Sequence, residues 1–262
     1  MLKVIYESYF SGEEADLRTL LEGWFQDPKG YFQMGLQKLK EMRSVQGARI
    51  LEVGCSTGQF LATLKKQGAL VEGIDVHAKA AAYARAWYGL EIKTGRVEEV
   101  SSYFPNQYFD CLVMFELIEH VLDPVDVLRQ LRPFLAKKGL LLLSTPNFDL
   151  FWRQRSGYPD LSSRFEHLHF FREKTLKLLA EKTGFQIHCL IRCGAEIPFS
   201  EQWLARSGLR PLLTYWWPRL RSFPPLAYSL RLAYRATNLL TKRAGLEKDS
   251  KAGYLLIASK SP

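Results

Sequence analysis

Short apolar runs alternate with longer amphipathic segments over most of the chain after residue 47. The apolar runs predict buried strands, and the amphipathic segments predict helices that cover them. Nearly continuous apolar strands separated by helices are typical of a mostly parallel sheet with helices on both faces. Strands are predicted at 49–53, 70–75, 91–94, 108–115, 140–144, 185–192 and 254–259, and helices at 59–67, 78–88, 124–136 and 173–183. The sequence therefore predicts an α/β fold with seven strands.

Two regions depart from this alternation. Residues 13–44 read as helical, with a break at 27–30, and they precede the first strand. Residues 195–250 are rich in Trp, Arg, Leu and Pro and predict a helical insertion before the last strand. The expected organisation is an N-terminal helical segment at 1–44, a main domain formed by 45–194 and 251–262, and an insertion at 195–250.

The charge of the chain is concentrated in its C-terminal quarter. The net charge is +9, yet residues 192–262 hold 12 of the 36 Lys and Arg and only 4 of the 27 Asp and Glu. We expect a cytoplasmic, reduced protein, because the N-terminus lacks the features of a signal peptide and the four cysteines form no disulfide or zinc pattern. No apolar run is long enough to predict a membrane-spanning helix.

A glycine-containing turn follows the first predicted strand, in the run Glu52-Val53-Gly54-Cys55-Ser56-Thr57-Gly58. Ligands of open parallel sheets bind at the carboxyl ends of the strands, where glycines let the backbone approach them closely. Asp75 ends the second strand and could accept hydrogen bonds from the hydroxyls of a ribose. A dinucleotide site is excluded, because its fingerprint needs glycines where Ser56 and Gln59 stand. The plain alternative is an ordinary strand–helix turn.

The loop resembles motif I of the class I S-adenosylmethionine (SAM)-dependent methyltransferases, with Ser56 in place of the usual middle glycine. Further segments resemble this family in the same order, namely 71–75, 109–113, 115–121 with 123–124, 140–146 and 166–171. The run Glu116-Leu117-Ile118-Glu119-His120 is similar to that of ubiquinone-biosynthesis O-methyltransferases. The resemblance covers roughly residues 45–193 and the last strand, and it implies a Rossmann-like fold and SAM as cofactor.

The resemblance also implies which residues bind the cofactor. The methionine part of SAM would lie against Gly54, the ribose against Asp75, and the adenine against Val76 and the loop at Arg96. The family often has an acidic residue where Arg96 stands. The complete predicted set is Glu52, Gly54, Cys55, Ser56, Gly58, Asp75, Val76, Arg96, Val97 and Phe115.

Catalytic candidates follow the fourth predicted strand, where the methyl acceptor should lie. Methyl transfer to a hydroxyl needs alignment and a base, and His120, with Glu116 beside it, fits that role. The Glu-x-x-Glu-His run also resembles a metal-ligand motif of ubiquinone-biosynthesis and small-RNA 2′-O-methyltransferases, in which His167 or His169 would add a ligand. The pattern allows a divalent metal without favouring one, because Glu116 could instead face the cofactor while Glu119 is solvated.

The expected identity of the methyl acceptor depends on the role of the 195–250 insertion. Its tryptophans and arginines fit a substrate cap with peripheral membrane contact, a nucleic-acid surface, or a helical packing unit that makes a dimer contact. Arginines interleaved with long apolar stretches favour membrane over nucleic acid. The expected function is SAM-dependent O-methylation of a small-molecule or lipid-like acceptor such as a quinone, phenol or glycan. An RNA 2′-O-methyltransferase with a divalent metal and a non-enzymatic membrane or assembly module are the alternatives, and the sequence does not indicate the oligomeric state.

Overall fold

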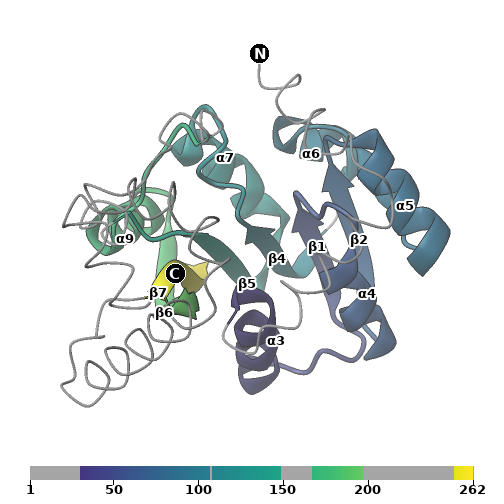
Figure 1. The fold of residues 1–262 in the computed structure, drawn as a ribbon, viewed down its shortest axis with the longest axis horizontal. Coiled ribbons are helices and arrows are strands. Elements are labelled where there is room, and N and C mark those ends of the chain that lie inside the picture. Colours follow the sequence, from purple (N-terminus) through teal and green to yellow (C-terminus); the bar gives the residue numbers. More distant parts are fainter. Residues whose placement is uncertain (1–29, 107, 149–166, 197–250, 262) are drawn as a thin grey trace, which may run out of the picture. The chain divides into compact units, whose positions relative to one another are not determined.

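A seven-stranded sheet organises the part of the chain that the computed structural model describes, which is residues 30–106, 108–148, 167–196 and 251–261 (Figure 1). The strand order is β3-β2-β1-β4-β5-β7-β6. The strands are β1 (Arg49–Val53), β2 (Leu70–Asp75), β3 (Ile92–Thr94), β4 (Phe109–Phe115), β5 (Leu135–Pro146), β6 (Phe185–Glu196) and β7 (Lys251–Lys260). The strands from β3 to β5 pair in parallel, and β7 pairs antiparallel with β5. The predicted Rossmann-like, mostly parallel α/β sheet is confirmed.

Side chains of alternate strand residues point to opposite faces of the sheet, so each face carries buried apolar side chains. Helices cover both of these faces. The helices are α3 (Tyr31–Met42), α4 (Gln59–Lys66), α5 (Ala78–Tyr88), α6 (Val100–Tyr103), α7 (Pro124–Leu131) and α9 (Glu173–Lys182), with short 3-10 turns η1 (Val97–Glu99) and η2 (Arg132–Phe134). On one face, α3 and α4 pack against a cluster that includes Ile50 and Val113. On the other face, α6, α7 and α9 pack against a cluster that includes Leu51 and Leu112.

Helix α3 is tied to the sheet at its C-terminal end. The Arg43 guanidinium donates to the carbonyl of Asp110 at 2.7 Å and to its carboxylate at 2.8 Å. The second carboxylate oxygen of Asp110 accepts the backbone N–H of Arg49 at 2.9 Å. This network fixes the end of α3 against β1 and β4, and it helps to place the first turn of α3 over the opposite ends of those strands.

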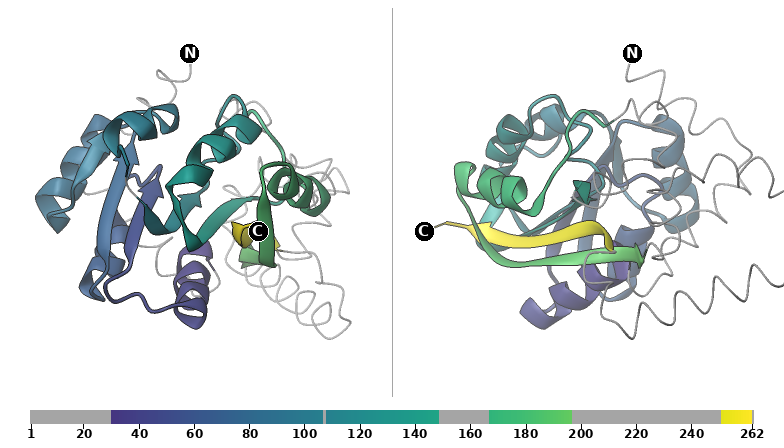
Figure 2. Two further views of the ribbon diagram at one scale, coloured as in Figure 1. Left: turned by 180° about the vertical axis from the view of Figure 1, so that it is seen from behind. Right: turned by 60° about the vertical axis from the view of Figure 1, so that its left-hand side comes forward.

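Several boundaries differ from the sequence prediction. The helix expected at 124–136 ends at Leu131, since Pro133 has no N–H to continue the α-helical bonding, and η2 follows instead. Strand β5 then begins at Leu135, and a register shift against β4 separates this first pairing from the run that starts at Leu140. Strands β6 and β7 extend beyond their predicted ends and lie side by side at one edge of the sheet (Figure 2).

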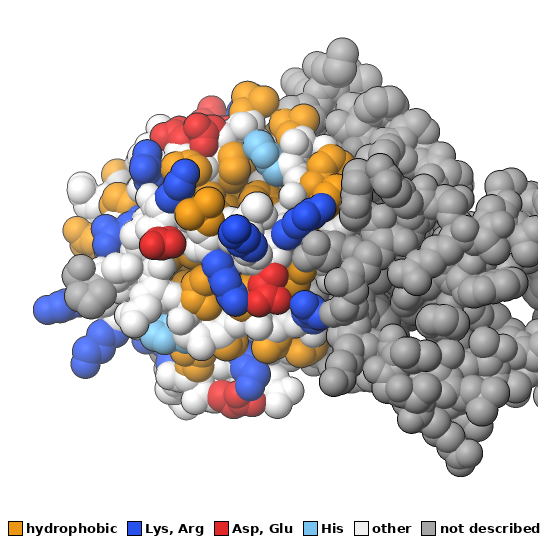
Figure 3. All heavy atoms as spheres, turned by 90° about the vertical axis from the view of Figure 1, so that its left-hand side faces the viewer, with side chains coloured by type: hydrophobic (Ala, Val, Ile, Leu, Met, Phe, Trp, Pro, Cys, Tyr) orange, Lys and Arg blue, Asp and Glu red, His pale blue; other side chains and the backbone are white. Residues whose placement is uncertain are grey.

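The chain divides into two compact units, and the first contains the sheet, with residues 1–146, 166–194 and 253–262. The second contains 147–165 and 195–252. Most of the predicted insertion, 197–250, lies outside the described residues, as does the helix expected before residue 27. On the face in Figure 3, acidic, basic and hydrophobic side chains of the described residues are interspersed. None of the described helices combines the length and apolar character that crossing a membrane requires.

Candidate functional site

The loop after β1 adopts a backbone that favours glycine. Gly54 and Gly58 have φ of 75° and 74°, and Ser56 between them has φ of 47°. The left-handed region costs an L-residue about 1–2 kcal/mol, so the glycines fit and Ser56 stands in a strained conformation. Gly54 donates its N–H to the carbonyl of Ile74 at 2.8 Å, which binds this loop to the end of β2. The loop predicted to hold a nucleotide therefore has a tight and well-defined turn.

Asp75 joins two loops at the end of β2. Its carboxylate accepts the backbone N–H of Ser56 at 2.6 Å and that of His77 at 2.8 Å. The side chain is largely buried, and burial raises its pKa from the usual value. Each carboxylate oxygen has a lone pair beyond the one that accepts these bonds. Asp75 can thus accept further hydrogen bonds from the hydroxyls of a ligand.

Glu52 is the penultimate residue of β1, near Asp75, and it is buried, with 2% of its surface exposed. Burial raises the pKa of the Glu52 carboxyl well above its usual value, and the neighbouring charge of Asp75 raises it further. The Oε2 atom of Glu52 has no hydrogen-bond partner among the described residues. A buried hydrogen-bond acceptor without a donor lowers the stability of the fold. A ligand with an N–H or O–H donor or a positive charge would therefore stabilise this atom.

The loop after β3 lies next to this pair of strand ends. The N–H of Gly95 donates to the carbonyl of Asp75 at 3.0 Å, which places Arg96 and Val97 beside the exposed Val76. The Arg96 guanidinium, however, forms an ion pair with Glu98 at 3.2 Å and is mostly exposed. The backbone of this loop is therefore better placed than the Arg96 side chain to flank a ligand.

An aromatic cluster closes the site from the side of α3. Phe115, the last residue of β4, lies 4.9 Å from Phe60, 5.2 Å from Phe32 and 5.3 Å from Tyr31, measured between ring centroids. Helix α3 approaches this ring closely, since a Cβ atom on Gly35 would lie 3.0 Å from Cζ of Phe115. Cys55, in the loop after β1, is buried as a free thiol. The cluster thus links the first turns of α3 and α4 to the carboxyl end of β4.

Tyr31 adds a polar group to this wall. Burial raises the pKa of the Tyr31 phenol well above its usual value, and the carboxylates of Glu116, Glu119 and Glu52 raise it further. The phenol therefore stays protonated at neutral pH and lies near acidic groups contributed by both β1 and the segment after β4. It is a hydrogen-bond donor at the site from a helix to which the sequence assigned no site role.

Glu116 follows β4 in a conformation that is rare for a residue with a side chain. Its φ is 49°, and its N–H donates to both the carbonyl and the hydroxyl of Ser144, at 3.2 and 3.1 Å. The Ser144 hydroxyl donates in return to the Glu116 carboxylate at 2.7 Å. Strained residues of this kind cluster at functional sites. Ser144, at the end of β5, thus holds both the backbone and the carboxylate of Glu116.

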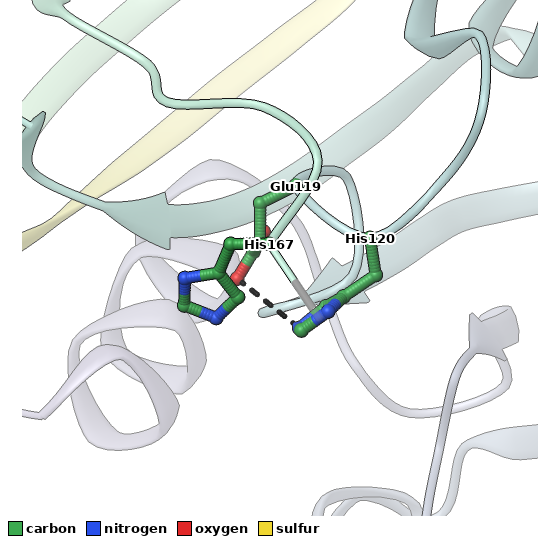
Figure 4. A group of neighbouring side chains, drawn as sticks. All are labelled: Glu119, His120 and His167. Atoms are coloured by element: carbon green, nitrogen blue, oxygen red, sulfur yellow. Dashed lines mark ion pairs between the residues drawn. The ribbon is translucent and has the colours of Figure 1, made fainter. Parts of the chain in front are cut away.

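Glu119, His120 and His167 converge at one point (Figure 4). The Glu119 side chain is almost fully buried, and its Oε1 lies 3.8 Å from Nε2 of His120. The imidazole rings of His120 and His167 meet edge to face, with centroids 4.7 Å apart. One ligand atom from each of the three residues lies within 4.8 Å of the others. The arrangement suits either a base supported by a carboxylate or a divalent cation on one carboxylate and two imidazoles.

The two later histidines have different surroundings. His167 joins the cluster, whereas Nε2 of His169 lies 3.2 Å from the carbonyl of Leu122. The backbone N–H groups of Leu168 and His169 donate to the carbonyl of Glu119 at 2.8 and 3.0 Å. These bonds bring the 167–171 segment beside the residues that follow β4. Of the two alternatives left open by the sequence, His167 is the one placed to complete a cluster.

The residues at the carboxyl ends of β1, β2 and β4 fit the cofactor predicted from the sequence. The Oε2 atom of Glu52, which has no partner among the described residues, suits the ammonium group of a SAM methionine part. Gly54 carries no side chain at the turn, and Asp75 retains lone pairs for a ribose. Sequence reasoning missed Tyr31, Ser144 and Thr145. A signal for the last two exists, because they are polar residues that follow the apolar run Leu140–Leu143 at the carboxyl end of a parallel strand.

Comparison with known proteins adds an independent finding. A family model described as a methyltransferase domain matches residues 19–190. The chain is 33% identical over 137 residues to the ubiquinone biosynthesis O-methyltransferase of Bordetella bronchiseptica, which covers 50% of this chain and 51% of that protein. The chain spans about half the length of the curated relatives it matches.

Solved structures share the fold. An S-adenosylmethionine-dependent methyltransferase from Mesorhizobium loti matches with a TM-score of 0.57 and 17% identity, covering 87% of this chain and 97% of that one. The plantazolicin methyltransferase BpumL, solved with SAH, matches with a TM-score of 0.56 and 18% identity, covering 100% of this chain and 95% of that one. The chain therefore belongs to the methyltransferase domain family, with the fold of class I SAM-dependent methyltransferases.

Proposed function

We propose that this protein is a SAM-dependent methyltransferase that acts on an oxygen atom of a small-molecule or lipid-like acceptor, such as a quinone, phenol or glycan. The observation that carries the proposal is the buried pair Glu52 and Asp75 beside the turn at Gly54. The methyltransferase family membership and the relatives named as O-methyltransferases support it.

Cofactor binding would follow from the groups already described. Glu52 would accept the ammonium group of SAM, and Asp75 would accept the ribose hydroxyls while its bonds to Ser56 and His77 keep it in place. Val76 and the backbone at Val97 would flank the adenine, and the buried Phe115 would form the floor beside Cys55. Bound SAM supplies a methyl group on a sulfonium, which is open to in-line attack.

The acceptor would lie near His120, and the chain would align it and remove its proton. An imidazole suits proton transfer at neutral pH, and the Glu119 carboxylate, 3.8 Å away, would stabilise the imidazolium that forms. Glu116, held by Ser144, would border the same space. Alignment of the reacting atoms and exclusion of water account for most of the rate of such a transfer.

Isothermal titration calorimetry with SAM and with S-adenosylhomocysteine tests this proposal. We expect the full chain to bind both, and Asp75→Asn to weaken binding by about tenfold or more, because hydrogen bonds to a charged group contribute about 1.5–3 kcal/mol. Glu91→Gln, which changes an exposed carboxylate just before β3, serves as the control and should bind as the wild type does. Absence of binding at millimolar SAM would contradict the proposal.

The acceptor class needs a separate assay. Transfer of a labelled methyl group to a panel of catechols, phenols and glycans, followed by mass spectrometry, identifies the acceptor and the modified atom. Transfer to RNA instead, with binding that falls steeply as salt rises, would favour the RNA alternative. A cellular role that persists in Asp75→Ala would favour the non-enzymatic alternative. Membrane contact through residues 195–250 and a cytoplasmic location stay predictions.

A second mechanism is favoured by the convergence of Glu119, His120 and His167. A divalent cation held there would bind an acceptor diol and lower its pKa. A set of one carboxylate and two imidazoles suits Mn²⁺, Fe²⁺ or Zn²⁺ better than Mg²⁺. His120 could then not act as the base, because its lone pair would bind the metal, so the two mechanisms exclude each other.

Metal dependence distinguishes the two mechanisms. If a metal is used, dialysis against a chelator abolishes turnover, added Mn²⁺ restores it, and His167→Gln impairs turnover far more than His169→Gln. The two histidines lie in one segment, yet only His167 belongs to the cluster, so they form a matched pair. Turnover that survives chelation favours the base mechanism.

A further inference from the structure

The end of β5 presents two consecutive hydroxyl groups to the residues that follow β4. Ser144 Oγ donates to the Glu116 carboxylate at 2.7 Å, and Thr145 Oγ1 donates to the Glu119 carboxylate at 3.0 Å. Ser144 and Thr145 are both at most 1% exposed. Each glutamate of the Glu-x-x-Glu-His run is therefore held by a different, buried hydroxyl from one neighbouring strand.

Glu119 is held at both its side chain and its backbone. Thr145 fixes one carboxylate oxygen, and the Glu119 carbonyl accepts the N–H groups of Leu168 and His169. The second carboxylate oxygen is the one that lies 3.8 Å from Nε2 of His120. Rotation of the Glu119 carboxylate would change this distance, so the bond from Thr145 sets the geometry between Glu119 and His120.

Glu116 depends on Ser144 in a similar way. Its left-handed backbone is unfavourable for a residue with a Cβ atom, and it persists only where the surroundings compensate. Two hydrogen bonds from the Glu116 N–H to Ser144 and one from the Ser144 hydroxyl to its carboxylate provide that compensation. The direction of the Glu116 side chain is thus determined by β5.

We infer that Thr145 and Ser144 are positioning residues of the site, whose hydroxyls orient the carboxylates of Glu119 and Glu116 toward the space beside His120. The inference rests on the proposed methyl transfer and adds residues to it. Neither hydroxyl is required to touch the cofactor or the acceptor. Buried partners of this kind fix the orientation of the groups they hold, and their loss typically lowers activity about 10- to 100-fold.

A set of substitutions separates positioning from a contribution to folding alone. Thr145→Val keeps the shape of the side chain and removes the hydroxyl, whereas Thr145→Ser keeps the hydroxyl. Thr183→Val is the matched control, because among the described residues the buried Thr183 hydroxyl donates only to carbonyls of α9, those of Leu179 and Ala180. Ser144→Ala tests the second hydroxyl and decides the matter if Thr145→Val does not fold.

The expected result is a fall in kcat of about 10- to 100-fold for Thr145→Val, with KM for SAM and affinity for S-adenosylhomocysteine within about twofold of the wild type. Thr145→Ser should retain kcat within about threefold. Thr183→Val should lower Tm and leave kcat unchanged. A Thr145→Val protein that behaves like Thr183→Val, or a Ser144→Ala protein with full kcat where Thr145→Val is unfolded, overturns the inference.

A spectroscopic readout keeps this inference distinct from the proposed function. The imidazole resonances of His120 in ¹H–¹⁵N spectra at one fixed pH should move in Thr145→Val and stay in place in Thr145→Ser, while those of the exposed His188 stay unchanged. If the wild type binds no SAM, the proposed function fails, yet these spectra still decide the positioning role. Unmoved His120 resonances in a folded Thr145→Val protein contradict it.

Discussion

The carboxylates of Glu52 and Asp75 are buried together at the ends of the adjacent parallel strands β1 and β2. Their negative charges repel, and this repulsion adds to burial in raising the pKa of Glu52. Asp75 is compensated by two backbone N–H groups, whereas Oε2 of Glu52 has no such donor among the described residues. The free protein therefore holds a carboxylate whose charge is better stabilised by a ligand than by the fold.

Replacing Glu52 by Gln should stabilise the free protein and weaken SAM binding. The folded-state pKa of Glu52 is raised, so the folded state binds more protons than the unfolded state, and Glu52 reduces stability as pH rises above its ordinary pKa of about 4.5. The gain in the free energy of unfolding for Glu52→Gln should therefore be larger at pH 8 than at pH 5, reaching about 1–2 kcal/mol.

Urea unfolding at pH 5 and pH 8 measures this change, with calorimetry for SAM. The exposed Glu91→Gln variant is the control and should leave both quantities unchanged. Equal effects of Glu52→Gln at the two pH values would show that Glu52 has the same pKa in the folded and unfolded states, which contradicts the raised folded-state pKa.

The fold could be predicted from the sequence because the apolar runs are long and regular. The run Leu140–Leu143 is buried on both faces of the sheet, and the turn signals at Gly54 and Gly184 mark strand and helix ends correctly. The end of α7 was misplaced because Leu135 and Ala136 continue its helical pattern, while Pro133 interrupts the backbone bonding. Local sequence patterns do not show where a strand begins after such an interruption.

The candidate site could be predicted from the sequence only in part. Glu52 and Asp75 could be placed together because the carboxyl ends of parallel strands meet at one edge of a sheet. The partnership of Thr145 with Glu119 joins residues 26 positions apart, and nothing in either local sequence specifies it. Tyr31 comes from a helix that precedes the sheet, and the packing of that helix against Phe115 is a tertiary property. The roles of all these residues stay predictions.

Alanine in place of Gly58 should be more disruptive than alanine in place of Gly47. Both glycines have nearly the same left-handed φ, 74° and 73°. A Cβ atom on Gly58 would lie 2.7 Å from Cδ1 of Leu90, whereas one on Gly47 would meet nothing within 4 Å. We expect a loss of about 1 kcal/mol for Gly47→Ala and about 2–4 kcal/mol for Gly58→Ala. Denaturant unfolding measures both values, and similar losses would contradict the crowding argument.

Glutamine in place of His120 should slow methyl transfer without changing cofactor binding. The imidazole lies beside Glu119 rather than at the loop after β1, so its loss removes either a base or a metal ligand. We expect kcat to fall by about 10²- to 10⁴-fold, the range typical of general acid–base groups. His188→Gln, at an exposed histidine that bonds Ser259, should keep the wild-type kcat. Full activity in His120→Gln would remove this residue from the mechanism.

Phenylalanine in place of Tyr31 should weaken the interaction with the bound substrates and leave the fold intact. The ring contacts to Phe32 and Phe115 persist in the variant, while the hydroxyl near Glu116 and Glu119 is lost. A single neutral hydrogen bond contributes about 0.5–1.5 kcal/mol, so kcat/KM should fall about two- to tenfold.

Steady-state kinetics, with the concentrations of SAM and of the acceptor varied in turn, show whether the Tyr31 hydroxyl contacts SAM or the acceptor. A rise in KM for SAM alone would place the hydroxyl on the cofactor, and a rise for the acceptor alone would place it on the acceptor side. Tyr108→Phe, at an exposed tyrosine before β4, is the control and should match the wild type in kcat/KM and Tm. If Tyr31→Phe also matches the wild type, α3 supplies only an apolar wall, because the ring alone would then account for every contribution of Tyr31.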